Sequence, residues 1–184
     1  MDLMNNLKPE LKKLVDNELR SRERVSWAGQ PIAKQRAISG FALWLFFIPW
    51  TGFSIFWVNG AIEQSKGESA FPLFGIPFLL IGIWMLLTPI REWFKANKTV
   101  YVVTNQRAFT IEAIKSIKVT NFNSEHITNI EKKINIDGSG DLILLKENYV
   151  DSDGDKQTKE KGFFAVTDVK LVENYIQKMC EGNT

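Results

Sequence analysis

The chain has 184 residues, with 23 lysines and arginines against 21 aspartates and glutamates, and its formal net charge is +2. A charge this small gives no reason to expect a nucleic-acid partner. His126 is the only histidine and Cys180 the only cysteine in the sequence, so an internal disulfide is excluded. A zinc site or a catalytic Cys–His pair has almost nothing to be built from. We therefore expect no catalytic residue, no metal and no cofactor.

The first structured element that the sequence predicts is an amphipathic helix over residues 8–21. Leu11, Leu14 and Val15 recur there at helical spacing among charged side chains, and Pro9 suits the first turn. Such a helix lies either in the lipid headgroup layer or against the folded part of the chain. Its mixed acidic and basic side chains favour packing on protein over a lipid surface.

Two long apolar runs follow. Ile38–Val58 and Phe71–Ile90 contain no Asp, Glu, Lys or Arg. At about 1.5 Å of rise per residue, each run forms a helix about 30 Å long, which is the thickness of a bilayer's hydrocarbon core. Two helices without a polar face leave a chain of this size too little material to bury them. The runs predict a transmembrane hairpin over residues 38–90, between an N-terminal segment (1–37) and a C-terminal domain (91–184).

The charges that flank the hairpin predict its orientation. Five basic residues lie on the outer sides of the two runs: Lys34, Arg36, Arg91, Lys95 and Lys98. The loop between the runs carries Lys66 as its one cation, beside Glu63 and Glu68. The positive-inside rule therefore predicts that both termini lie in the cytoplasm and that the short loop lies outside. The same five residues are candidate contacts for lipid headgroups, although setting the topology requires the same side chains.

Three further residues of the hairpin, and one just before it, suggest contacts. Gly75 and Gly82 are seven residues apart, so they share a helix face and allow the other helix to approach. Trp50, near the middle of its run, faces lipid, a partner protein or the hairpin itself. Trp27, just upstream of the first run, is a candidate interfacial anchor.

After Lys98 the pattern changes to short, β-rich segments separated by turns. The expected strands lie at Thr99–Thr104, Arg107–Glu112, Ser116–Thr120, around Ile134 and Ile136, Leu142–Leu145 and Gly162–Val166. Asp168 then opens a final amphipathic helix, which either Thr167 or Asp168 can cap. Consecutive strands joined by turns predict a largely antiparallel, bent sheet with a helix available to cover it. The expected fold class is therefore α+β, a transmembrane helical hairpin followed by this sheet domain.

Three stretches of the sequence resemble the bacterial pleckstrin-homology-like (PH-like) family of two-span membrane proteins: Glu23–Pro31, Tyr101–Arg107 and Asp137–Leu142. The resemblance implies a PH-like domain, which is a bent antiparallel sheet or barrel capped by a C-terminal helix. It also implies a membrane-anchored binding or assembly module of the bacterial inner membrane, without an assigned reaction. We expect Arg107, within the second stretch, to be structural and to tie a strand to its turn.

Two loops have the outline of ligand sites but lack the required residues. Asp151, Asp153 and Asp155 have the spacing of a calcium loop, but Lys156 stands where that loop needs glycine and Gly162 where it needs glutamate. We interpret this segment as a solvated hairpin loop. The glycine-rich stretch 137–141 lacks a following helix and a phosphate-binding lysine, so we expect a tight strand connection.

The resulting hypothesis is a non-enzymatic integral membrane protein that presents a PH-like binding or scaffolding domain at the cytoplasmic membrane surface. The alternative is a structural subunit of a larger or homo-oligomeric membrane complex. The expected partners are membrane lipids and either a protein or a second copy of the chain, with no nucleic acid. An enzyme acting on lipid is disfavoured because the sequence suggests no nucleophile–base pair or metal cluster.

Overall fold

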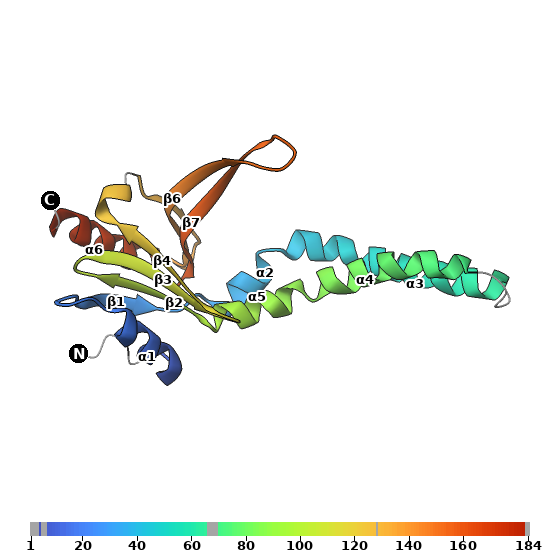
Figure 1. Cartoon of the computed structure of the whole chain (residues 1–184), viewed down its shortest axis with the longest axis horizontal. Coiled ribbons are helices and arrows are strands. Elements are labelled where there is room, and N and C mark those ends of the chain that lie inside the picture. The colour runs from blue at the N-terminus through green and yellow to red at the C-terminus, as the bar shows by residue number, and fades with distance from the viewer. Residues whose placement is uncertain (1–3, 5–6, 66–69, 128, 183–184) are drawn as a thin grey trace. The chain divides into compact units, whose positions relative to one another are not determined.

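The computed structural model describes every residue except 1–3, 5–6, 66–69, 128 and 183–184 (Figure 1). The chain divides into two compact units. The sheet unit consists of Met1–Ala33 together with Phe94–Thr184, and the hairpin unit consists of Lys34–Trp93. The N-terminal segment 1–37, predicted as a separate part, therefore belongs up to Ala33 to the same unit as the C-terminal strands.

The described residues contain six α-helices, seven strands and two short 3-10 helices, η1 (Phe71–Phe74) and η2 (Ser124–His126). The helices are α1 (Pro9–Glu18), α2 (Ala33–Ile38), α3 (Phe41–Ser65), α4 (Gly75–Leu86), α5 (Thr88–Ala96) and α6 (Val169–Gly182). The strands are β1 (Val25–Gly29), β2 (Thr99–Thr104), β3 (Arg107–Ala113), β4 (Ile117–Asn123), β5 (Glu131–Ile134), β6 (Gly140–Val150) and β7 (Lys156–Val166).

The hairpin unit contains the two long apolar helices that the sequence predicts. Leu43–Ser65 and Phe71–Ala96 are long and apolar enough to cross a membrane, with mean hydropathies of 1.4 and 2.2. Only 11% of each apolar window is buried within the chain, so neither is the core helix of a globule. The first long helix starts at Phe41, later than expected, because Ser39 and Gly40 form a turn that separates it from α2. The predicted loop residues Lys66 and Glu68 lie outside the described residues.

The two helices of the hairpin pack through the glycine face that the sequence indicates. Gly75 and Gly82 are buried, and a methyl group added at either would run into α3, against Val58 and Thr51 respectively. The Trp50 indole N–H donates to the Phe78 carbonyl at 3.4 Å, with ring centroids 6.1 Å apart. Trp50 therefore has contacts within the hairpin, which is one of the three alternatives that the sequence leaves open.

The sheet unit contains two antiparallel sheets (Figure 1). The first has the strand order β1-β2-β3-β4 and the second β5-β6-β7. All pairings are antiparallel, as the turn signals predict. In the described part of the chain β4 and β5 do not pair with each other, so the two sheets do not close into one barrel. Strands β6 and β7 extend beyond β5 as a two-stranded arm, and the exposed Asp151–Asp155 loop joins them at its tip.

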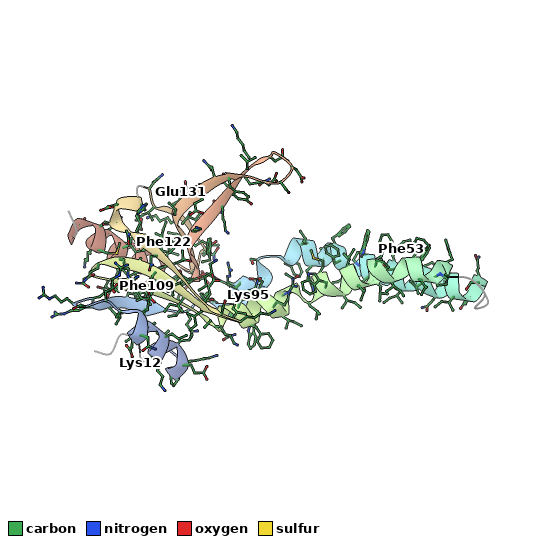
Figure 2. The ribbon with its side chains drawn as sticks, viewed as in Figure 1. Lys12, Phe53, Lys95, Phe109, Phe122 and Glu131 are labelled. Atoms are coloured by element: carbon green, nitrogen blue, oxygen red, sulfur yellow. The ribbon has the colours of Figure 1, made fainter. Side chains whose placement is uncertain are left out.

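One core fills the space between the two sheets and α6. Tyr101, Phe122 (Figure 2), Phe163 and Val172 belong to it. The rings of Tyr101 and Phe163 stack at 4.7 Å, and Trp27 stacks on Phe163 at 6.2 Å. The suggestion that Trp27 is an interfacial anchor is therefore wrong. It sits on β1 and packs on this core, because β1 adds to β2 instead of leading straight into the first apolar helix.

A second, smaller core lies between α1 and the β1–β4 sheet. Val15 is fully buried there against Val100, Val102 and Phe109 (Figure 2). The α1 helix runs from Pro9 to Glu18, within the predicted bounds. Its apolar stripe is thus covered by protein, as its mixed charges indicate, and no lipid surface is needed to bury it.

The turns follow the chemistry of their residues. Gly138 has a φ of 83°, a left-handed conformation that suits glycine, in the tight β5–β6 connection. The Asp137 carboxylate accepts hydrogen bonds from the Ser139 N–H and hydroxyl, as expected of a strand connection. The Asp168 carboxylate accepts from the Leu171 N–H at 3.0 Å, so of the two candidate caps for α6 it is Asp168 that makes the capping hydrogen bond.

Candidate functional site

The five basic residues proposed to meet lipid headgroups are divided between the two units. Lys34, Arg36 and Arg91 belong to the hairpin unit, and Lys95 and Lys98 belong to the sheet unit. Lys34, Lys95 and Lys98 are exposed, whereas Arg36 and Arg91 are half-buried. The three exposed lysines are the members of the set best placed to meet a charged surface.

Both arginines of the set have partners within the hairpin unit. Arg36 forms an ion pair with Glu92 at 3.6 Å, joining α2 to α5. The Arg91 guanidinium lies 4.2 Å from the centroid of the Trp84 ring and donates to the Thr88 hydroxyl at 3.1 Å. A partly exposed ion pair of this kind contributes on the order of 0–1 kcal/mol to stability. These contacts fix the orientation of the two arginine side chains, and both side chains stay positively charged.

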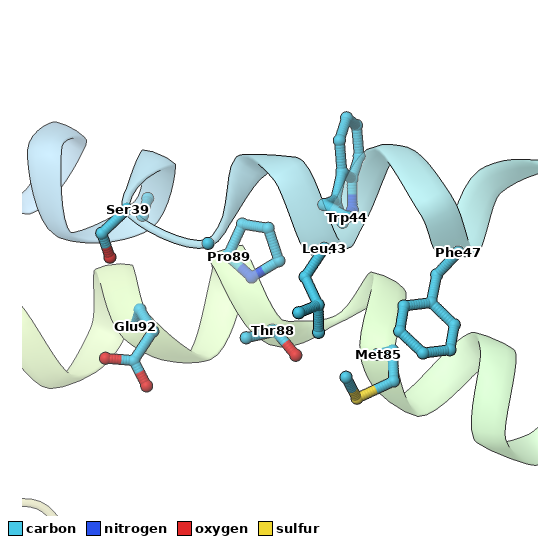
Figure 3. Close-up of a pocket in the computed structure, with 10 residues that line it drawn as sticks. Ser39, Leu43, Trp44, Phe47, Met85, Thr88, Pro89 and Glu92 are labelled. Carbon is cyan, nitrogen blue, oxygen red and sulfur yellow. The ribbon is translucent and has the colours of Figure 1, made fainter.

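A crevice of about 250 Å³ opens in the hairpin unit beside the Arg36–Glu92 pair (Figure 3). Its walls are mainly apolar, and Ser39, Thr88 and Glu92 supply polar atoms. The residues that line it are Ala37, Ser39, Gly40, Leu43, Trp44, Phe47, Met85, Thr88, Pro89 and Glu92. The Trp44 indole N–H donates to the Leu86 carbonyl at 3.1 Å, which holds this wall in place. Such a cleft suits an apolar chain with a polar end.

The sheet unit contains a buried polar network around Arg107, which is 1% exposed. Its Nε donates to Glu23 Oε1 at 3.0 Å, and its Nη2 donates to the main-chain oxygen of Glu18 at 2.8 Å. Its Nη1 donates to Asn121 Oδ1. Glu18 ends α1, so the guanidinium satisfies one of the carbonyls that a helix C-terminus leaves unpaired. The expectation that Arg107 is structural is confirmed. Its side chain contacts α1 and β4 as well as its own turn.

Glu23 is the acidic centre of this network, and its side chain is fully buried. Burial raises the pKa of Glu23, but hydrogen bonds from Arg107, from the Arg20 N–H and from the Thr104 hydroxyl together lower it further than burial raises it. The pKa of Glu23 therefore lies below its ordinary value. Glu23 is charged and paired in the folded protein, and it holds the chain that enters β1.

Acidification should destabilise the sheet unit through Glu23. Because the folded-state pKa is depressed, this contribution is complete above the ordinary glutamate pKa of about 4.3 and is lost as the pH falls through the folded value. Glu23→Gln should therefore lower the melting temperature in detergent at neutral pH and flatten its fall in acid. Glu10→Gln, at an exposed position on α1, is the control. An unchanged acid slope in Glu23→Gln would contradict this assignment.

The two loops with the outline of ligand sites are built as turns. Asp151 Oδ1 accepts from the N–H groups of Asp153 and Asp155, both at 3.0 Å, so this oxygen holds the hairpin loop together. Across the described residues no group of three or more His, Cys, Asp or Glu side chains is placed to hold a metal ion. The solvated hairpin loop that we expect is the one observed, with Asp151–Asp155 largely exposed.

No family model, curated protein or solved structure matches the chain.

Sequence reasoning missed the crevice and the acidic half of the Arg107 network. A signal for the crevice was present, since Ser39-Gly40 separates α2 from α3, and the Thr88-Pro89 pair begins α5 after the break at Leu87. Glu18 and Glu23 lie 89 and 84 residues from Arg107, and no local pattern connects them to it. Their pairing becomes visible only once α1 and β1 are seen to pack on the sheet.

Proposed function

We propose that this chain is a non-enzymatic, two-span protein of the bacterial inner membrane that presents a PH-like binding or scaffolding domain at the cytoplasmic surface. The observation that carries the proposal is the pair of long apolar helices with 11% of each window buried. Large apolar side chains such as Phe53, Phe56 and Phe74 are exposed there, and water would solvate them poorly. A bilayer supplies the missing cover.

The sheet unit supports the PH-like part of the proposal in outline. Two antiparallel sheets that do not close into a barrel share a core with a C-terminal helix, and this helix-covered core is the feature that supports the resemblance. The basic residues flanking the apolar helices favour a cytoplasmic location for this unit. Its function there is positioning: a domain tethered at the membrane meets membrane-resident partners at a raised effective concentration.

The alternative, a structural subunit of a larger or homo-oligomeric complex, has weaker support. Trp50, Gly75 and Gly82 motivated it, and all three have contacts within the hairpin. Self-association remains a prediction, which the particle size in mild detergent tests. A strictly monomeric particle would contradict self-association and favour the function of a binding or scaffolding module.

Membrane location and orientation can be tested together by cysteine accessibility in whole bacteria. In a Cys180→Ser background, Gln64→Cys marks the loop end of α3 and Ser152→Cys marks the β6–β7 loop, and both positions are exposed. A membrane-impermeant maleimide should label Gln64→Cys in intact cells and Ser152→Cys only after permeabilisation. Release of the protein by alkaline carbonate would contradict the membrane proposal, and the reverse labelling pattern would contradict the orientation.

A further inference from the structure

The turn between β3 and β4 carries apolar side chains where a soluble turn is usually polar. Ile114 and Ile117 are 40% and 60% exposed, in the exposed sequence Ile114-Lys115-Ser116-Ile117-Lys118. An isoleucine neither favours a turn nor contributes to stability when it faces water. Two of them alternating with two lysines make a small amphipathic surface. Neither core of the sheet unit includes these residues.

This turn lies at the end of the β1–β4 sheet where the chain arrives from α5. The Ala113 N–H donates to the Lys98 carbonyl at 2.9 Å, and Glu112 pairs with Thr99 across β3 and β2. Gln30, which follows β1, donates to the carbonyls of Asn97 and Thr99. Both stretches of chain that continue into the hairpin unit therefore leave the sheet unit at this one end.

The charge of this end is strongly positive. Lys95 and Lys98 precede β2, Lys115 lies in the turn and Lys118 is the second residue of β4, all four exposed. Within residues 94–100 and 111–119, Glu112 is the one acidic residue. The second apolar helix ends at Ala96, only two residues before Lys98, and two residues of extended chain span about 7 Å at most. Four lysines and two exposed isoleucines are thus tied closely to the end of an apolar helix.

We infer that Lys95, Lys98, Ile114, Lys115, Ile117 and Lys118 form a docking surface for anionic phospholipids of the leaflet from which the second apolar helix emerges. The two isoleucines enter the boundary between headgroups and acyl chains, where apolar side chains lose contact with water. The four lysines lie among the anionic headgroups. The inference rests on the proposed membrane location. The docking surface attaches the sheet unit to the membrane at a second place besides the hairpin. This contact fixes the orientation of the sheet unit on the lipid and leaves the opposite end of the sheet accessible to partners.

Depth-dependent fluorescence quenching tests the docking surface in the full-length protein. In a Cys180→Ser background, Ile117→Cys carries a nitrobenzoxadiazole label, and the protein is reconstituted into phosphatidylcholine vesicles with or without phosphatidylglycerol. Asn123→Cys is the matched control, because it is exposed on the same strand and lies about 20 Å from position 117. Lipids with a nitroxide near the headgroup should quench the label at 117 severalfold more than the label at 123.

Phosphatidylglycerol should strengthen the quenching at position 117. Each lysine beside an anionic surface favours binding by about fivefold, so Lys115→Gln with Lys118→Gln should lower the bound-to-free ratio of the turn by roughly 25-fold. Because both side chains are exposed, these substitutions should leave folding intact. Quenching at 117 that is unaffected by phosphatidylglycerol and by the two substitutions would overturn the electrostatic part of the inference.

A label in the hairpin separates failure of this inference from failure of the proposed function. Phe53→Cys lies at an exposed position of α3 and should be quenched by lipids with a deeply placed nitroxide. If it is not quenched, the membrane proposal itself fails. If the label at 53 is quenched while 117 is as unquenched as 123, the docking surface is overturned. Protection of 117 only in native membranes, with cross-links to protein, would overturn it in favour of a protein partner.

Discussion

Arg107→Met should destabilise the sheet unit by about 3–5 kcal/mol, the usual cost of removing one partner from a buried ion pair. The side chain is 1% exposed and donates to Glu18, Glu23 and Asn121. Methionine fills similar space, but it leaves the Glu23 carboxylate buried without its main partner. For a unit of this size the change corresponds to a fall in melting temperature on the order of 10–20 °C, measured by circular dichroism in mild detergent.

Two further variants show that the effect comes from the network. Lys159→Met removes an exposed cation of β7 and should change the stability by no more than about 0.5 kcal/mol. The double variant Arg107→Met with Glu23→Gln should be less destabilised than the sum of the two single changes, because the second removes the charge that the first leaves unpaired. A stability of Arg107→Met within about 1 kcal/mol of the parent would show that the network does not hold α1 and β1 in place.

The strands of the C-terminal region could be predicted closely because their signals are local. The Val- and Tyr-rich segment Thr99–Thr104 is β2 residue for residue, and Leu142–Leu145 and Gly162–Val166 lie inside β6 and β7. Both of these strands extend much further along the polar arm than predicted. Alternation of apolar and polar side chains marks a half-buried strand, whereas the arm is exposed on both faces and leaves no such pattern.

β1 could not be predicted, because what makes it a strand lies far along the chain. Its partner β2 is separated from it by the whole hairpin unit, with Ala28 opposite Val102. Gly29 and Pro31 only indicate that a helix cannot continue there. The same distance hid the role of Glu23, and it made Trp27 look like a membrane anchor when it belongs to a protein core.

The candidate lipid contacts were predicted by charge alone, and charge does not distinguish their surroundings. Arg36 and Arg91 have partners within the hairpin unit, whereas Lys95 and Lys98 share one end of the sheet with the exposed β3–β4 turn. The strand expected at Ser116–Thr120 includes Ile117, and its alternation of apolar and polar side chains did not indicate that Ile117 is exposed. Only the pairing of β3 with β2 brings these isoleucines beside Lys98.

Gly82→Ala should loosen the hairpin, whereas the same change at Gly52 should not. A Cβ atom at position 82 would overlap Thr51 Oγ1 and lie 3.2 Å from the Thr51 Cβ, an atom that side-chain rotation cannot move away. The Thr51 hydroxyl also donates to the Phe47 carbonyl at 2.7 Å and has little freedom to turn aside. Overpacking of this kind typically costs about 1–3 kcal/mol. The expected result is a lower unfolding temperature of the hairpin in mild detergent.

Gly52 is the matched control because it is a glycine of α3 with open space where its Cβ would be. Alanine favours a helix over glycine by about 1 kcal/mol, so Gly52→Ala should leave the hairpin as stable as the parent or more so. The two substitutions add the same methyl group, and opposite signs can therefore come only from the contact with α3. Equal stability of the two variants would mean that the helices do not meet at Gly82, and the close approach that defines the hairpin would have to be abandoned.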